Sequence, residues 1–180
     1  MSNYFSTVPI DHDDGSNTYV DTNNVLLWGG TKTLMGYNKH HVNQLMAYVD
    51  YQPALHAPAR TRIGWSAPQS KPPMCSGFIV PTPMVLGKSE VWQNNTCISS
   101  DAAHFFRWYS CNSSNPLDGG TPAPLSDNRY YSSNAGYTLS CGEASWNLSQ
   151  AQQRGLDLRS TLHALPTLET LLGMMEALLL

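Results

Sequence analysis

Short apolar runs that begin with asparagine recur along the first fifty residues of the chain. They cover 3–5, 24–28 and 43–49, and their first asparagines are 24 − 3 = 21 and 43 − 24 = 19 residues apart. Turn-forming residues at 13–17 and 29–32 lie between the runs. Units of strand and turn at this spacing are typical of a solenoid of stacked coils, and the helical period of roughly 3.6 residues is absent. The pattern predicts an all-β protein built from repeats.

Later β-prone runs extend this pattern toward the C-terminus. A segment rich in Pro, 51–74, and a segment rich in Pro and Gly, 115–126, interrupt it, and we expect both to be loops that leave the stack. The coils are therefore predicted to occupy 1–165. The predicted later strands are 77–80, 90–92, 95–98, 105–109 and 127–131.

The end of the chain has a different periodicity. Thr167 is placed to cap a helix over 166–180, because apolar residues follow it at the spacing i, i+3, i+4 and i+7. A segment of this length with two glutamates is too short and too polar to cross a bilayer. We expect a short amphipathic helix that covers an otherwise open end of the stack. The periodic positions are Leu168, Leu171, Leu172, Met175 and Leu179.

Composition supports a β-rich fold and excludes one class of partner. The chain has 180 residues, a formal net charge of −3 and only 13% charged residues. Its polar residues are largely Asn, Ser, Thr and Tyr, which favour strands and turns over helices. Because no basic excess is present to neutralise phosphates, nucleic acid is not an expected partner. No membrane association is expected either.

The cysteines and glycosylation motifs favour an extracellular protein. The four cysteines form no CxxC pair and lack neighbouring histidines at zinc-site spacing, so we predict disulfides, with three connectivities open. Sequons begin at Asn94, Asn112 and Asn147. The first residues, 1–6, do not resemble a signal peptide. The chain is therefore expected to be the C-terminal part of a longer secreted protein with further coils upstream. The cysteines are Cys75, Cys97, Cys111 and Cys141.

Several motifs together resemble the right-handed parallel β-helix proteins, the pectate-lyase-like superfold of many carbohydrate-active enzymes. The first stretch resembles a rung of the form D-D-G-S … N-N-V … G-G, and the last resembles a closing D-N-x-Y-Y … W … G-x-D-x-x-S. The resemblance implies a fold of stacked coils in which inward asparagines form ladders of amide hydrogen bonds. The ladder asparagines are expected to be Asn24, Asn43, Asn95 and Asn128. The motifs lie at 10–16, 23–25, 29–32, 127–131, Trp146, 155–157 and Ser160.

The acidic segment near the N-terminus is the first candidate for catalysis. On a strand Asp11 and Asp13 would share one face, with His12 and Asp14 on the other, and Lys32 would lie one coil away. Paired carboxylates suit glycosidic hydrolysis, and a base with a cation suits a polysaccharide lyase. The alternative is that Asp13 and Asp14 belong to a turn. We predict catalytic roles for Asp11, Asp13, Asp14 and Lys32, with His12 in substrate binding.

A second candidate region contributes to substrate binding. Glu90 and Asp101 are a possible carboxylate pair, and Trp92 and Trp108 could stack on sugar rings, with a core position as the alternative for such aromatics. His40 and His41 are adjacent on a predicted strand, so their side chains diverge and we assign them surface or core roles. No metal or other cofactor is predicted, with calcium as the alternative in a lyase.

Two functions follow as hypotheses. The first is the C-terminal part of a glycoside hydrolase or polysaccharide lyase that acts on or binds polysaccharide. The second is a non-catalytic extracellular scaffold or binding protein that is inactive as this fragment.

Overall fold

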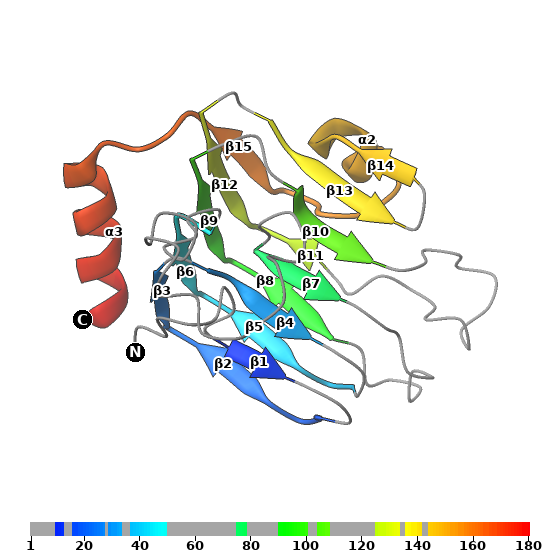
Figure 1. Cartoon of the computed structure of the whole chain (residues 1–180), viewed down its shortest axis with the longest axis horizontal. Coiled ribbons are helices and arrows are strands. Elements are labelled where there is room, and N and C mark those ends of the chain that lie inside the picture. The colour runs from blue at the N-terminus through cyan, green and yellow to red at the C-terminus, as the bar shows by residue number, and fades with distance from the viewer. Residues whose placement is uncertain are drawn as a thin grey trace, which may run out of the picture.

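The computed structural model describes residues 10–12, 16–27, 29–33, 37–49, 75–78, 90–100, 104–108, 125–133, 136–141 and 144–180. These residues form mostly short strands in parallel sheets, followed by a helix near the C-terminus (Figure 1). The expectation of a mostly β protein with a short C-terminal helix is confirmed.

The described strands form three sheets that we number 1 to 3. In sheet 1, β14 (Ala144–Trp146) runs antiparallel to its neighbour β13 (Thr138–Cys141), and all other strand pairings in the three sheets are parallel. The parallel strands of sheet 1 are β1 (Ile10–His12), β4 (Thr31–Thr33), β7 (Ser76–Phe78), β10 (His104–Trp108) and β13 (Thr138–Cys141). Sheet 2 contains β2 (Val20–Thr22), β5 (His40–Val42), β8 (Val91–Gln93) and β11 (Leu125–Ser126). Sheet 3 contains β3 (Val25–Leu27), β6 (Leu45–Ala47), β9 (Thr96–Ser99), β12 (Arg129–Ser132) and β15 (Thr161–His163).

Consecutive strands from β1 to β13 belong to different sheets, and every third strand returns to the same sheet. We call one set of three consecutive strands, one from each sheet, a tier: β1 to β3 form tier 1 and β4 to β6 form tier 2. The chain therefore passes through the three sheets in a constant order. Between β13 and β15, Leu158 pairs with Ser126 of β11 as an isolated parallel bridge, and this bridge takes the place of a further strand in sheet 2.

Register between tiers 1 and 2 is offset by twenty residues in sheets 2 and 3, and by 31 − 10 = 21 residues in sheet 1, where Ile10 pairs with Thr31. Val25 pairs with Leu45 and Asp21 pairs with His41, so 45 − 25 = 20 and 41 − 21 = 20. The asparagine spacing of 19 placed Asn43 above Asn24, and this alignment is wrong by one residue. Asn43 lies above Asn23, because the hydrogen-bond register and not the identity of the side chain sets the alignment.

Where the chain turns from sheet 2 into sheet 3, which we call the corner, the first residue after the strand has the left-handed backbone conformation in successive tiers. We call these residues the outer row. Asn23, Asn43 and Asn94 have φ of 55°, 55° and 53°, a region that asparagine tolerates better than most side chains. The amide of Asn43 donates to Asn23 Oδ1 over 2.7 Å, and that of Asn94 donates to Asn43 Oδ1 over 3.1 Å. In the next two tiers Asp127 and Arg159 continue the row as a bidentate ion pair.

One residue further along the chain, buried side chains form a second row at the same corner, which we call the inner row. Asn95 Oδ1 accepts from the backbone N–H of Gln44, Asn128 Oδ1 accepts from that of Asn95, and Ser160 Oγ accepts from that of Asn128, at 2.9, 2.9 and 2.8 Å. Asn95 and Asn128 are therefore buried and aligned as predicted, but they connect through a backbone N–H and not through the predicted bond between two side-chain amides. Asn43 belongs to the outer row, and Asn24 precedes β3 at the position that Gln44 occupies in tier 2.

Removing one inner amide should destabilise the protein. In Asn128→Ala, the buried N–H of Asn95 loses its acceptor and the Trp92 carbonyl loses a donor, which we expect to cost about 2 kcal/mol of unfolding free energy. Asn94→Gly is the matched control, because it removes an exposed outer amide at a positive φ that glycine accepts, and should cost less than about 1 kcal/mol. Urea unfolding monitored by circular dichroism compares the two. Equal losses would contradict the assigned role of the inner row.

A short helix that the sequence analysis missed packs beyond the last sheet 1 strands. It is α2 (Leu148–Gln153), which Asn147 and Gln150 begin with a reciprocal capping box. Its Ala151 is fully buried and belongs to the same apolar cluster as Tyr137 and Leu139. Figure 1 shows α2 and β14 together at the top of the molecule, at the end of the stack opposite β1 and β2.

The predicted C-terminal helix is confirmed as α3 (Leu168–Leu179), with Thr167 as its N-cap. Leu171 is its buried residue and joins an apolar cluster with Leu45 and Ile98 of sheet 3. Figure 1 places α3 alongside sheet 3, and its capping role at an end of the stack stays a prediction. Within the described residues, no helix is long and apolar enough to span a membrane.

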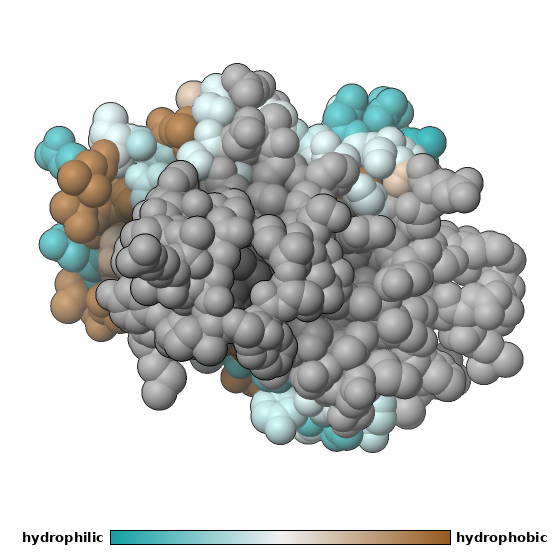
Figure 2. Space-filling view, in the orientation of Figure 1, coloured by the Kyte–Doolittle hydropathy of each residue, from teal (hydrophilic) through white to brown (hydrophobic). Residues whose placement is uncertain are grey.

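The outward side of α3 is apolar as well. Its exposed leucines include Leu168, Leu172 and Leu179, at 67%, 49% and 71% exposure. Figure 2 shows this apolar surface at the left of the view, where α3 lies.

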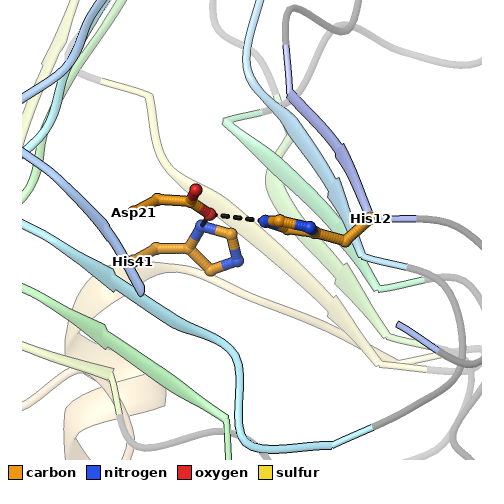
Figure 3. A group of neighbouring side chains, drawn as sticks. All are labelled: His12, Asp21 and His41. Carbon is orange, nitrogen blue, oxygen red and sulfur yellow. Dashed lines mark hydrogen bonds and ion pairs between the residues drawn. The ribbon is translucent and has the colours of Figure 1, made fainter. Parts of the chain in front are cut away.

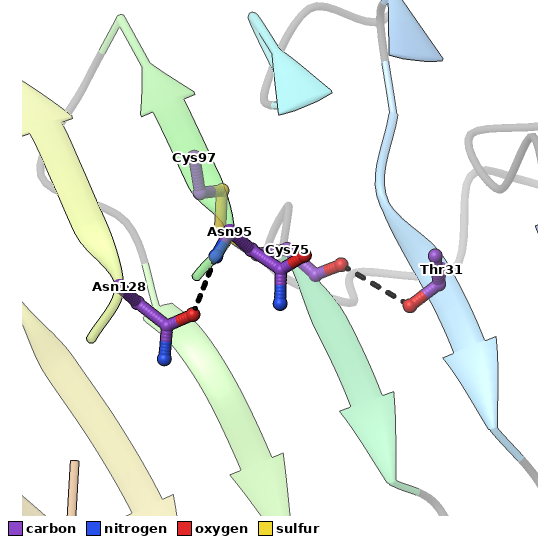
Figure 4. Close-up of a disulfide and its surroundings, with 5 residues drawn as sticks. All are labelled: Thr31, Cys75, Asn95, Cys97 and Asn128. Carbon is purple, nitrogen blue, oxygen red and sulfur yellow. Dashed lines mark hydrogen bonds between the residues drawn. A yellow bond between two sulfur atoms is a disulfide. The ribbon is translucent and has the colours of Figure 1, made fainter. Parts of the chain in front are cut away.

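Cys75 and Cys97 form a disulfide, so two of the four predicted disulfide cysteines are paired with each other (Figure 4). Cys75 directly precedes β7 and Cys97 lies in β9, and both are buried. The bond therefore joins sheets 1 and 3 within one tier. Cys111 and the side chain of Cys141 lie outside the described part of the chain.

The predicted loops are only partly within the described residues. The segment 51–74 and most of 115–126 lie outside them. The end of the second loop was placed too late, because Leu125 and Ser126 already form β11 and pair with Trp92 and Gln93. Backbone pairing with the preceding tier, and not the Pro and Gly content, determines where this strand begins.

Candidate functional site

A cluster of polar side chains faces the interior where tiers 1 and 2 meet. Asp21 of β2 is partly buried between the exposed residues Val20 and Thr22, and the alternation of a strand turns it inward. His41 is directly beside it in β5 and is fully buried. His12 approaches from β1 in sheet 1 and is also buried. Two sheets therefore contribute to the cluster.

One carboxylate oxygen contacts both imidazole rings. Asp21 Oδ2 is 2.5 Å from His12 Nε2 and 3.0 Å from His41 Nδ1 (Figure 3). The three candidate ligand atoms all lie within 4.8 Å of one another. The Asp21 side chain is 16% exposed, whereas that of His41 is completely covered, so the cluster is reached from the Asp21 side.

The environment of the cluster favours an ionised carboxylate beside a neutral imidazole. Burial raises the pKa of Asp21, but hydrogen bonds from His12 and His41 outweigh burial and hold this pKa well below its usual range. Burial lowers the pKa of His41, and the hydrogen bond to Asp21 offsets only part of that effect. Asp21 is therefore charged, and the buried His41 favours its neutral form.

A buried ion pair lies next to the cluster. Lys39 Nζ is 2.9 Å from Glu90 Oε1, and the Lys39 side chain is completely covered. Burial raises the pKa of Glu90, and the Lys39 charge opposes this shift. Lys39 also acts electrostatically on His41, and His12 on Glu90, so the pair and the cluster share one electrostatic environment.

Aromatic rings pack on both imidazoles. The ring centroids of Tyr19 and His12 are 4.7 Å apart, those of His12 and His41 are 5.4 Å apart, and those of His41 and Trp92 are 5.1 Å apart. Tyr19 is half exposed and Trp92 is fully buried, so the series runs from the surface into the core. This packing restricts rotation of the two imidazoles and keeps them near Asp21.

The first predicted catalytic group is described only in part. Asp11 and Lys32 are paired in register between β1 and β4, so Lys32 lies one strand away from Asp11, as the repeat predicts. Their side chains, and Asp13 and Asp14 altogether, lie outside the described part of the chain. Of this group, His12 is the residue that the structure brings into the cluster. The catalytic roles stay predictions.

The second predicted group is also described only in part. Glu90 forms an ion pair with Lys39. Trp92 is fully buried and its ring packs against that of His41, so Trp92 has the core position that was the alternative to stacking on a sugar. Asp101 lies outside the described residues, and of Trp108 only the backbone, in β10, is described. Nothing in the described part of the chain brings these four side chains together.

Two of the predicted glycosylation asparagines are exposed. Asn94 belongs to the outer asparagine row, and Asn147 caps α2 through its side-chain oxygen. Asn112 lies outside the described residues. Glycosylation at all three positions stays a prediction.

Sequence reasoning missed Asp21 and assigned His41 only a surface or core role. The signal that connects them is their separation of 41 − 21 = 20 residues, which is the offset between the first two strands of sheets 2 and 3. The prediction of no metal also overlooked that two imidazoles and a carboxylate converge here. Such a set can transfer a proton along hydrogen bonds or bind a metal ion.

Comparisons with protein-family models, with curated proteins and with solved structures found no match to this chain. Functional inferences therefore depend on the residues and topology of the chain itself.

Proposed function

We propose that the chain forms part of a right-handed parallel β-helix. The constant order of the three sheets supports this, since strands at every third position pair in parallel. The inner row of side chains at the corner between sheets 2 and 3 also supports it, because stacked coils align equivalent residues. A right-handed path is expected because parallel crossover connections are almost always right-handed.

We further propose that the protein is secreted and acts on or binds polysaccharide, as a glycoside hydrolase or polysaccharide lyase. The observation that carries the proposal is the register pairing of Asp11 with Lys32 in neighbouring strands of sheet 1. A carboxylate and a cation on adjacent strands are the charges that sugar-chain cleavage uses at its reacting centre. The buried Cys75–Cys97 disulfide supports secretion, since such bonds persist in oxidising compartments.

Asp11→Asn and Lys32→Gln variants of the whole protein test this function. We expect each to reduce cleavage of the preferred polysaccharide by about a hundredfold, because positioned acid–base groups contribute roughly this much or more. A panel of plant and algal polysaccharides, assayed for reducing ends and for unsaturated products, separates hydrolysis from elimination. His163→Gln is the control, because His163 is exposed in the last tier.

Full activity in both variants would exclude this pair from the mechanism. Absence of cleavage by the wild-type protein would instead favour the second function, a non-catalytic extracellular scaffold or binding protein.

A further inference from the structure

We propose that His12, Asp21 and His41 bind one divalent first-row transition metal ion, with Zn²⁺ as the representative. Two imidazole nitrogens and a carboxylate oxygen are ligands that such ions accept, whereas Ca²⁺ and Mg²⁺ prefer oxygen ligands alone. Three protein ligands would leave a further coordination position for water or a small molecule. The site is separate from the pairing of Asp11 with Lys32 and does not depend on the polysaccharide proposal.

The geometry requires only small side-chain adjustments. Ligand atoms lie about 2.0–2.2 Å from Zn²⁺, so two of them on one tetrahedral ion are separated by roughly 3.3 Å. The Asp21 oxygen is 2.5 Å and 3.0 Å from the two imidazole nitrogens, and all three atoms lie within 4.8 Å of one another. A metal ion would replace the two hydrogen bonds to Asp21. Each imidazole would then carry its proton on its other ring nitrogen.

The electrostatic surroundings suit a cation. Around the cluster, the described ionised side chains are Asp21, Glu90 and Lys39, so their formal charges sum to one negative charge when the histidines are neutral. The Lys39 ammonium is already paired with Glu90 over 2.9 Å, which leaves the Asp21 carboxylate as the anionic group for an incoming ion.

A neighbouring amide gives a second, independent observation. Gln44 is 1% exposed and its Nε2 is 3.4 Å from His41 Nδ1. Its Oε1 is buried and has no hydrogen-bond partner among the described residues. A buried amide oxygen without a partner is costly, and this amide contacts His41 through its Nε2, so a water carried by a bound ion is a donor that the amide oxygen would accept.

Metal binding can be measured on the whole protein without any substrate. The protein is prepared without a histidine tag, stripped with a chelator, and titrated with Zn²⁺ by calorimetry and with Co²⁺ by visible absorption. We expect about one equivalent bound by the wild-type protein. Asp21→Asn and His12→Gln should each lower the affinity by about a hundredfold or more, since loss of a direct ligand exceeds the 10–100-fold effect of supporting residues.

His40→Gln is the matched control, because His40 is adjacent to His41 but its ring nitrogen contacts Asn38 instead of the cluster. We expect this variant to bind Zn²⁺ like the wild-type protein, and circular dichroism checks that each variant is folded. A folded wild-type protein that binds no ion would overturn the proposal. So would unchanged affinity in Asp21→Asn, or an equal loss in His40→Gln. The polysaccharide assay is separate, so each proposal can fail alone.

Discussion

Replacement of Asp157 by alanine is expected to lower the free energy of unfolding by about 4 kcal/mol. Asp157 is fully buried in the last tier, and its carboxylate accepts three hydrogen bonds. Tyr137 Oη and Ser160 Oγ donate over 2.6 and 2.5 Å, and Asn128 Nδ2 donates over 3.2 Å. Alanine would leave these buried donors without this acceptor, and each such loss costs roughly 1–3 kcal/mol.

The same carboxylate connects several elements at this end of the stack. Tyr137 precedes β13, Asn128 precedes β12, and Ser160 precedes β15. The side chain of Gln152 in α2 also donates to the backbone carbonyls of Asp157 and Ser160. Alanine keeps these backbone carbonyls, so loss of the Asp157 carboxylate should reach α2 only by loosening the turn that presents them, and hydrogen exchange of the α2 amides would report this effect.

Asp127→Ala is the matched control. Asp127 and Asp157 both have positive φ, 60° and 50°, so alanine incurs a similar backbone penalty at the two positions. Asp127 differs because its partner is the exposed side chain of Arg159, and exposed ion pairs contribute little to stability. Urea unfolding should therefore show a much larger loss for Asp157→Ala. Equal losses would mean that the buried network adds nothing beyond the backbone penalty.

Structural features that depend on residues close together in the sequence were predictable. The helix at the C-terminus was found with its cap, because the apolar period of α3 and Thr167 are local signals. Predicted strands such as 95–98 and 105–109 lie within one residue of β9 and β10 for the same reason. The residues that begin α2 also carried a local signal, Asn147 with Gln150 three residues later, which was interpreted only as a glycosylation motif.

Features set by register were not predictable in the same way. The asparagine spacings of 21 and 19 bracket the offset of 20 between tiers 1 and 2 in sheets 2 and 3, but a shift of one residue turns a side chain to the opposite face of its strand. At the correct offset Asp21 lies beside His41. Sequence patterns alone therefore located the tiers but not the inward cluster, because His12 reaches it from another sheet.

The second large effect is expected from the disulfide. Simultaneous replacement of Cys75 and Cys97 by alanine should lower the free energy of unfolding by about 3 kcal/mol, because the bond closes a loop whose ends are 22 residues apart. Open loops of this length gain conformational freedom in the unfolded chain, which shifts the equilibrium toward unfolding. Both cysteines are buried, and alanine avoids placing an unpaired polar group there.

Reductant separates this bond from any pairing of the other two cysteines. A Cys111→Ala, Cys141→Ala variant should lose about 3 kcal/mol when dithiothreitol is added, because only Cys75 and Cys97 remain to be reduced. The Cys75→Ala, Cys97→Ala variant should reach the same loss without reductant. Peptide mapping under non-reducing conditions should link the peptides that contain Cys75 and Cys97. If the Cys111→Ala, Cys141→Ala variant unfolds identically with and without reductant, the Cys75–Cys97 bond does not contribute to stability. Packing alone would then hold sheets 1 and 3 together in tier 3, which comprises β7 to β9.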